Sequence, residues 1–170
     1  GGADFVFQIL TANSANVTAV SPGTVVMTTT GVGAADPDFY HFRYLIYYQC
    51  TSTTVGIAFT INHDAVGAGA NAIWWHVTTG GAAATGLGDD VAAVVAGQLV
   101  EGKTVSLNAS GSASTGVATI NTTVCAILEG TLYAPTSGSL ELKIATEVSG
   151  TAVRVTNGTT LYLTKLGNLV

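Results

Sequence analysis

The stretch FYHFRYLIYYQC, residues 39–50, decides the fold of this chain. Its odd-numbered positions mix apolar side chains with His41, Arg43 and Gln49, whereas its even-numbered positions are apolar throughout. Successive side chains of a β-strand point to opposite faces of a sheet, so this alternation predicts a strand with one buried face. The even positions that we expect in the core are Tyr40, Phe42, Tyr44, Ile46, Tyr48 and Cys50.

The sequence on both sides of this stretch is also typical of β-structure. Val and Thr are abundant and apolar residues alternate with small or polar ones, while Gly-rich stretches at residues 80–88 and 110–116 indicate loops. Residues 89–96 fit either a helical turn or a strand. The further strands that we expect are residues 5–10, 24–30, 55–61, 73–79, 99–107, 124–133, 140–148, 152–156 and 159–166.

Turn signals separate the last of these segments. Residues 135–138 read PTSG, and Ser149 with Gly150 marks a second turn. Asn157 and Gly158 lie between two alternating segments, which predicts a hairpin between residues 152–156 and 159–166.

About eight to ten short strands with frequent turns indicate an all-β fold, an antiparallel β-sandwich of jelly-roll architecture. The length of 170 residues suits one domain, and no internal repeat or linker divides it. We therefore expect an N-terminal arm or first strand over residues 1–23 and a single sandwich domain over residues 24–170.

The chain carries very little charge for a folded protein. Charged residues make up 9% of it, against roughly 25% in an average soluble domain, and the mean hydropathy is +0.47. The best candidate for a membrane span, residues 81–100, contains Asp89 and Asp90, and no basic, apolar leader is present. We infer a soluble protein whose surface is partly covered by another protein. Because the chain begins with Gly1 and Gly2 rather than Met, we expect a processed chain or a fragment.

The sign and spread of the charges exclude two classes of partner. The net charge is −5 and the pI is about 4.8. Five scattered basic residues cannot neutralise several phosphates, and an acidic surface suits anionic lipid poorly. We therefore expect neither nucleic acid nor a membrane as a partner.

No pattern in the sequence indicates a metal site, a cofactor or catalysis. His41, His63 and His76 share no ligand spacing, and His63 follows a strand at an expected turn. The chain has no GxSxG motif, and Gly clusters lack the strand-to-helix context of a phosphate loop. We expect no catalytic residue, no metal and no cofactor.

A glycan-active enzyme would need two carboxylates that face each other across a cleft. On residues 140–148, Glu141 and Glu147 flank Lys143 on the polar face, with Arg154 on the next segment, so we interpret them as a cross-strand charge ladder. A calcium site at Asp residues would need only oxygen ligands, but no DxDxDG pattern is present. The candidate carboxylates are Glu129, Glu141, Glu147, Asp64, Asp89 and Asp90.

The two cysteines, Cys50 and Cys125, form no CxxC motif and no disulfide framework. We expect both to be small buried side chains, and a single disulfide between them is the alternative.

Trp74 and Trp75 are adjacent on an expected strand, so one of them should face the core and the other the outside. An outward Trp can stack on a sugar or contact another subunit. Since the chain is short of charge, we favour a partner contact over a glycan contact.

Three stretches resemble a known family. They are FYHFRYLIYYQ at residues 39–49, TSTTVGIAFTIN at residues 51–62 and AILEGTLYAPTSGSLELKIATEVSGTAVRVTNGTTLYLTKLG at residues 126–167. Their order is similar to that in small β-rich virion domains of tailed bacteriophages, which occur as head decoration proteins, head fibres and tail-fibre C-terminal domains. The resemblance implies a jelly roll, often trimeric and similar to tumour-necrosis-factor domains, on the outside of the virion and without catalytic residues.

Two functions follow from this resemblance and from the shortage of charge. The first is a trimeric capsid decoration protein that binds itself and the major capsid protein or another virion protein. The alternative is a fibre or head-spike domain that binds a host cell-surface glycan. Because permanent interfaces are apolar and poor in charge, we expect the mixed face of residues 39–49, with Phe39, Leu45 and Tyr47, to contact neighbouring subunits.

Overall fold

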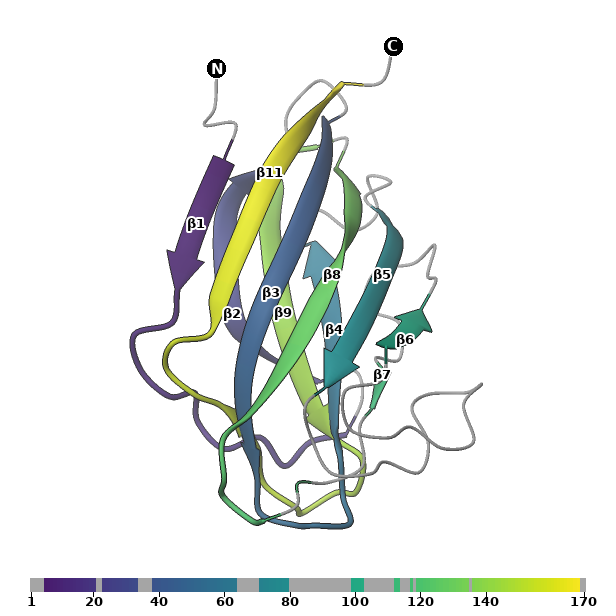
Figure 1. Ribbon diagram of the computed structural model, residues 1–170. Helices are drawn as coiled ribbons and strands as arrows, with labels where there is room; N and C mark the ends of the chain where they lie inside the picture. The colour runs from purple at the N-terminus through teal and green to yellow at the C-terminus, as the bar shows by residue number, and fades with distance from the viewer. Residues whose placement is uncertain are drawn as a thin grey trace.

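The computed structural model describes residues 5–20, 23–33, 38–63, 71–79, 99–102, 112–113, 117, 119–134 and 136–168. Within these ranges the chain forms eleven β-strands and no helix, and the strands pack face to face as two antiparallel sheets (Figure 1). The expected all-β, antiparallel β-sandwich is therefore confirmed. A helix long and apolar enough to cross a membrane does not occur in the described part of the chain.

The larger sheet has seven strands, and the decisive stretch of sequence forms its long strand β3 (Asp38–Cys50). The strand order is β1 (Phe5–Ile9), β11 (Thr160–Asn168), β3, β8 (Val124–Ala134), β5 (Asn71–Thr79) and β6 (Leu99–Gly102), and β10 (Val153–Val155) also pairs with β3. The smaller sheet has the order β2 (Thr24–Val32), β9 (Gly138–Thr146), β4 (Ile57–His63) and β7 (Ser112–Ala113). One first strand, β1, thus lies within residues 1–23.

The chain passes back and forth between the two sheets. Strands β1 to β4 alternate between the larger and the smaller sheet, and β8, β9 and β10 do the same. Such alternation is typical of a jelly roll, in which Greek keys are distributed over two sheets. Strands β5 and β6 depart from this pattern because they extend the larger sheet beyond β8. The jelly roll therefore stays a prediction, whereas the sandwich is observed.

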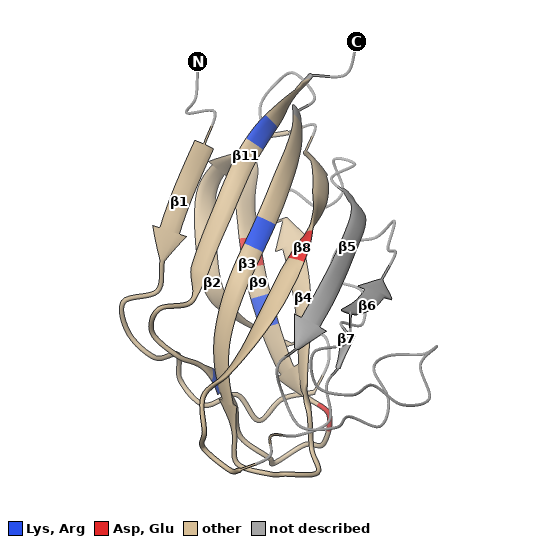
Figure 2. Cartoon of the chain, viewed as in Figure 1, with Lys and Arg blue, Asp and Glu red and all other residues tan. Residues whose placement is uncertain are grey.

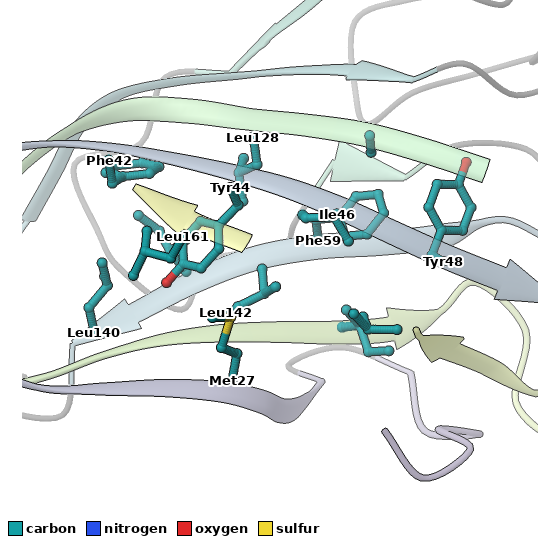
Figure 3. Packing of buried hydrophobic residues seen from close by; sticks show 14 of the residues in the cluster. Met27, Phe42, Tyr44, Ile46, Tyr48, Phe59, Leu128, Leu140, Leu142 and Leu161 are labelled. Atoms are coloured by element: carbon teal, nitrogen blue, oxygen red, sulfur yellow. The ribbon is translucent and has the colours of Figure 1, made fainter. Parts of the chain in front are cut away.

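The core lies between the sheets and is built on the even-numbered face of β3. Phe42, Tyr44, Ile46 and Tyr48 have no exposed surface, and Tyr40 and Cys50 are also buried. Figure 3 shows Phe42 and Tyr44 above Leu140 and Leu142 of β9 and Met27 of β2. Burying one large apolar side chain stabilises the folded state by about 1.5–3 kcal/mol, so the buried face of β3 makes a large contribution to the stability of the core. The predicted buried face is confirmed.

The hairpin predicted at Asn157 and Gly158 is wrong. β10 and β11 do not pair with each other, because both pair antiparallel with β3, one after the other along its length. Between them, the Thr156 amide donates to the Tyr47 carbonyl oxygen at 2.7 Å, and the Thr159 hydroxyl accepts from the Tyr47 amide at 3.0 Å. These bonds hold residues 156–159 beside β3, so the chain bulges outward and returns to the same strand without reversing.

Two other expected segments differ from the structure or lie outside it. Ser112 and Ala113, expected in a loop, form β7 and pair with β4 at Ala58 and Phe59. The loop at residues 80–88 and the helical turn or strand at residues 89–96 lie outside the described residues.

Candidate functional site

The outer face of the larger sheet is the surface on which the sequence places the predicted subunit contacts. On β3 the odd-numbered residues 39–49 are half-buried or exposed, in contrast to the buried even positions. The odd-numbered residues 125–133 of β8 are half-buried in the same way. The strands are in register, with Arg43 opposite Glu129 and Tyr47 opposite Cys125, so these side chains form one continuous surface.

The β1 side of this face carries four exposed large apolar side chains. The exposed fractions are 52% for Phe5, 53% for Phe7, 49% for Ile9 and 39% for Tyr162. The Phe7 and Tyr162 rings meet edge-on with centroids 5.2 Å apart, and the Phe5 ring lies 6.4 Å from Tyr162. We call these four residues the apolar edge patch. Sequence reasoning missed the patch, although the alternation of FVFQI over residues 5–9 already separates its two faces.

A small group of charged side chains lies in the middle of the outer face. The His41 Nε2 atom lies 2.8 Å from Glu129 Oε1, and Arg43 Nε lies 3.9 Å from Glu129 Oε2. Figure 2 shows a blue position on β3 and a red one on β8, a further blue one on β11, and no charged position on β1, whose sequence is FVFQI. The four residues of the apolar edge patch therefore add no charge to this face.

The three predicted contact residues lie on this outer face, at successive levels of β3. The Phe39 ring packs against Tyr133 with centroids 5.0 Å apart. Leu45 lies between Thr160 of β11 and Ile127 of β8, and all three predicted residues are half-buried. Tyr47 lines a pocket at the end of the sheet. The structure thus places the three residues on one surface, and their contact with a neighbouring subunit stays a prediction.

Trp74 and Trp75 lie on β5, next to β8 in the larger sheet. Trp74 pairs in register with Thr131, and Trp75 pairs with Gly130. Their side chains lie outside the described part of the structure, so their predicted contact with a partner or a glycan stays a prediction.

The candidate carboxylates that the structure describes are bound to their own neighbours. Glu129 contacts His41 on the larger sheet. Glu141, on the smaller sheet, accepts a hydrogen bond from the Asn62 amide at 2.7 Å, and Glu147 accepts one from the Gly56 amide nitrogen at 2.8 Å. Asp64, Asp89 and Asp90 lie outside the described residues.

The predicted charge ladder is only partly correct. Glu141 and Lys143 do follow each other on β9, but Arg154 is on β10 in the other sheet, where it bonds to Gln49. Lys143 is only 9% exposed, so it is not part of a solvated charge row. The error comes from expecting the turn at Ser149 and Gly150 to return residues 152–156 beside residues 140–148 in one sheet, whereas the chain crosses there to the larger sheet.

The two cysteines are unpaired and lie on opposite faces of the larger sheet. Cys50 is buried in the core and its thiol lies 3.0 Å from the Val55 carbonyl oxygen, whereas Cys125 is half-buried on the outer face. The alternative of a disulfide is therefore wrong, and the expected burial holds fully for Cys50 alone. Burial raises the pKa of both thiols above 9.0.

His63 does not lie in a turn as the sequence predicts, because it ends strand β4 and is fully buried. Its Nε2 atom lies 2.9 Å from the Val32 carbonyl oxygen, which ties β4 to the end of β2. Among the residues that the structure describes, no three side chains of the metal-binding types come together.

Comparisons with known proteins add little to this geometry. No family model matches the chain, and no curated protein matches it. Similar solved structures include one of the infectious bursal disease virus Gx strain, at 12% identity and a TM-score of 0.24, and a crystal structure of a particle of that virus, at 8% and 0.25. The matches cover 95% and 97% of this chain but 41% and 39% of those chains, so this chain spans about two fifths of their length. TM-scores this low carry no argument about fold or function.

Proposed function

We propose that this chain is a non-enzymatic structural protein of a virion, which forms a trimer and attaches to the outside of a capsid as a decoration protein. The observation that carries the proposal is the exposed apolar edge patch, Phe5, Phe7, Ile9 and Tyr162, on a sheet face with few charges. Contiguous exposed apolar side chains mark interaction surfaces, and aromatic residues are enriched there while charged ones are depleted.

The position of β1 strengthens this proposal. Among the described strands, β1 pairs only with β11, so that none of them pairs with its other edge. Soluble proteins protect such edges with Lys and other charged residues or with Pro, but residues 5–9 of this strand contain none of these. A neighbouring subunit that covers β1 and the patch would remove both the bare edge and the exposed rings from water.

The inner side of β1 is already held, so the exposed rings stand on an ordered strand. The Gln8 amide donates to the Thr28 carbonyl oxygen of β2 at 3.0 Å, and the Thr29 hydroxyl donates to Gln8 Oε1. This contact ties the larger sheet to the smaller one along the open side of the sandwich. A partner would therefore meet a pre-formed surface and would lose little conformational entropy on binding.

The proposed contact surface runs from the patch across β11 to β3. Phe39 and Leu45 fall within it, and Tyr47 lies at its margin beside the pocket. In a trimer, this face would meet the neighbouring subunits, and the remaining surface would be free to bind the major capsid protein. A role in catalysis is not part of the proposal, because the described carboxylates are each bound by their own neighbours.

Quantitative mass spectrometry of purified virus particles from the source of this sequence tests the proposal. A decoration protein should be present in hundreds of copies per particle and should be released before the capsid protein on mild denaturation. Absence of the chain from purified particles would overturn the virion role.

A fibre or head-spike domain is the second candidate function, and the pocket beside Tyr47 is the observation that favours it. The same quantification separates the two candidates, because a fibre would be present in a few to tens of copies per particle.

A further inference from the structure

A pocket of about 300 Å³ lies beside Tyr47 and Gln49, near the end of β3 that is drawn at the foot of Figure 1. Its volume is at the lower end of the range for ligand sites, and it is open to solvent. None of the lining side chains carries a charge. They are Asn13, Tyr47, Gln49, Thr123, Thr156 and Asn157.

One wall of the pocket is a row of hydrogen-bonded side chains across adjacent strands. Gln49 Oε1 accepts from Arg154 Nε at 2.8 Å and from Nη2 at 2.5 Å. The Gln49 amide nitrogen donates to the Thr123 hydroxyl oxygen at 2.9 Å. Because both ends of the Gln49 amide are held, the wall is ordered before any ligand arrives. The Thr123 hydroxyl, which accepts from Gln49, can still donate its hydrogen to a ligand.

The opposite wall is held by backbone contacts. Asn13 Oδ1 accepts from the Asn157 backbone amide at 2.9 Å. On either side, the Ser14 amide donates to the Val155 carbonyl oxygen and the Gly158 amide donates to the Leu10 carbonyl oxygen, both at 2.8 Å. These bonds leave the amide nitrogen of the Asn13 side chain as a donor, and the Asn157 side chain as a donor and an acceptor.

Tyr47 supplies the aromatic surface. Its backbone is fixed by Thr156 and Thr159, so the ring stands at a defined place between the two walls. Gly158 adopts a φ of +86°, and a Cβ atom there would lie 3.7 Å from the Tyr47 ring. Glycine at this position therefore leaves that edge of the ring uncovered.

We propose that this pocket binds a neutral saccharide. A sugar offers hydroxyl groups that both donate and accept, which the amides of Asn13 and Asn157 and the hydroxyl of Thr123 match. It also offers an apolar C–H face that stacks on a ring with a polar tip such as Tyr47. An anionic ligand is disfavoured because none of the lining side chains is cationic and Arg154, beside the pocket wall, is committed to Gln49. An apolar ligand would leave the polar walls without partners.

Because Tyr47 lies at the margin of the proposed contact surface, the proposal requires that a trimer leaves this margin open. The pocket differs in place from Trp74 and Trp75, which lie on β5. Its test uses the intact chain and four neutral probes: the methyl glycosides of glucose, galactose and mannose, and N-acetylglucosamine. Saturation-transfer NMR and titration should show millimolar binding of at least one of them. Tyr47→Ala should weaken this binding at least tenfold, whereas Tyr47→Phe should keep most of it because the ring remains.

Two further variants serve as a control outside the pocket and as a second substitution within it. Tyr133→Ala removes another outer-face ring outside the pocket and should bind the probe as the wild type does. Asn157→Leu changes an exposed turn residue, fills the mouth of the pocket without hydrogen-bonding groups, and should abolish binding even if Tyr47→Ala fails to fold. Failure of all four probes to bind, or binding unchanged in both Tyr47→Ala and Asn157→Leu, would overturn the proposal. Neither result would bear on the oligomeric state.

Discussion

The Phe7 ring meets the Tyr162 ring edge-on, with centroids 5.2 Å apart, on the outside of the larger sheet. Both rings are more than a third exposed, so the pair stabilises the β1–β11 contact only partly and leaves a large apolar surface in water. The exposed surface of these rings adds nothing to the stability of a monomer, whereas contact with a neighbouring subunit would bury it.

Substitution of Phe7 by Glu should weaken self-association. A desolvated charge opposes docking, and aromatic contacts often dominate an interface, so we expect the dissociation constant to rise about tenfold or more. The stability of the subunit should change by only about 0.5 kcal/mol, because Phe7 is 53% exposed. Sedimentation velocity across a dilution series measures the first effect, and thermal unfolding measures the second.

Val25→Glu is the matched control for this variant. Val25 is also an exposed apolar residue on a strand, but it lies on β2 of the smaller sheet and is 39% exposed. It should leave the association constant unchanged. Equal loss of association in both variants would mean that added charge, rather than the apolar edge patch, causes the effect.

Gly33 and Gly31 should respond very differently to alanine. Both have positive φ angles, +85° and +73°, so each substitution costs about 1–2 kcal/mol in backbone strain. At Gly33 a Cβ atom would also lie 2.2 Å from the Thr136 carbonyl oxygen, whereas at Gly31 nothing lies within 4 Å. Gly33→Ala should therefore destabilise the fold by roughly 3 kcal/mol or more, about twice the effect of Gly31→Ala. Chemical denaturation of both variants measures the difference, and equal values would refute the packing at this corner.

Tyr44→Phe should stabilise the protein. The Tyr44 hydroxyl is buried in the core and has no hydrogen-bond partner among the described residues, so removing it should add about 1 kcal/mol to the free energy of unfolding. Denaturation at neutral pH checks this gain. A loss of stability would show that the hydroxyl has a partner that the described contacts do not include.

Tyr44→Phe should also reduce the loss of stability at alkaline pH. Burial, and to a smaller extent the charge of Glu141, raises the pKa of Tyr44 well above its ordinary value of 10.0. Below pH 10 both states keep this proton, and above it only the unfolded state loses the proton, so stability falls with rising pH. At pH 11 this group alone costs about 1.4 kcal/mol, which Tyr44→Phe should not lose. Denaturation curves of the wild type and Tyr44→Phe at neutral pH and at pH 11 test this prediction. An equal loss of unfolding free energy in both proteins between these pH values would contradict it.

Alkylation should distinguish the two thiols. Cys125 is half-buried on the outer face and Cys50 is buried in the core, so iodoacetamide should modify Cys125 alone in the folded protein. Because burial raises the pKa of Cys125, modification should be slow at neutral pH and faster as the pH rises. Peptide mass spectrometry reads the sites, and equal labelling of both cysteines, or a disulfide between them, would refute this arrangement.

The sequence predicts the layer that each β3 residue faces, because alternation over twelve residues leaves no other way to bury six apolar side chains. It does not predict the partners of β10. Asn157 and Gly158 favour a local hairpin, but β3 is long enough to pair with both flanking segments, and the Thr156 and Thr159 hydroxyls bind its backbone. A long-range pairing thus overrides a local turn preference.

The sequence likewise predicts only part of the candidate site. Phe39, Leu45 and Tyr47 were identified from the mixed face of one strand, and they do share a surface. Among the described strands β1 is the last of its sheet, and this position of Phe7 beside Tyr162 is a matter of topology that alternation alone does not reveal. The pocket likewise combines Asn13 with Asn157, which are 144 positions apart in the chain.

The oligomeric state of the chain in solution tests the central claim most directly. If other copies cover the outer face of the larger sheet, sedimentation velocity at micromolar concentration should show one species with three times the 17.1 kDa mass of the chain. A monodisperse monomer over the same range of concentration would contradict the claim.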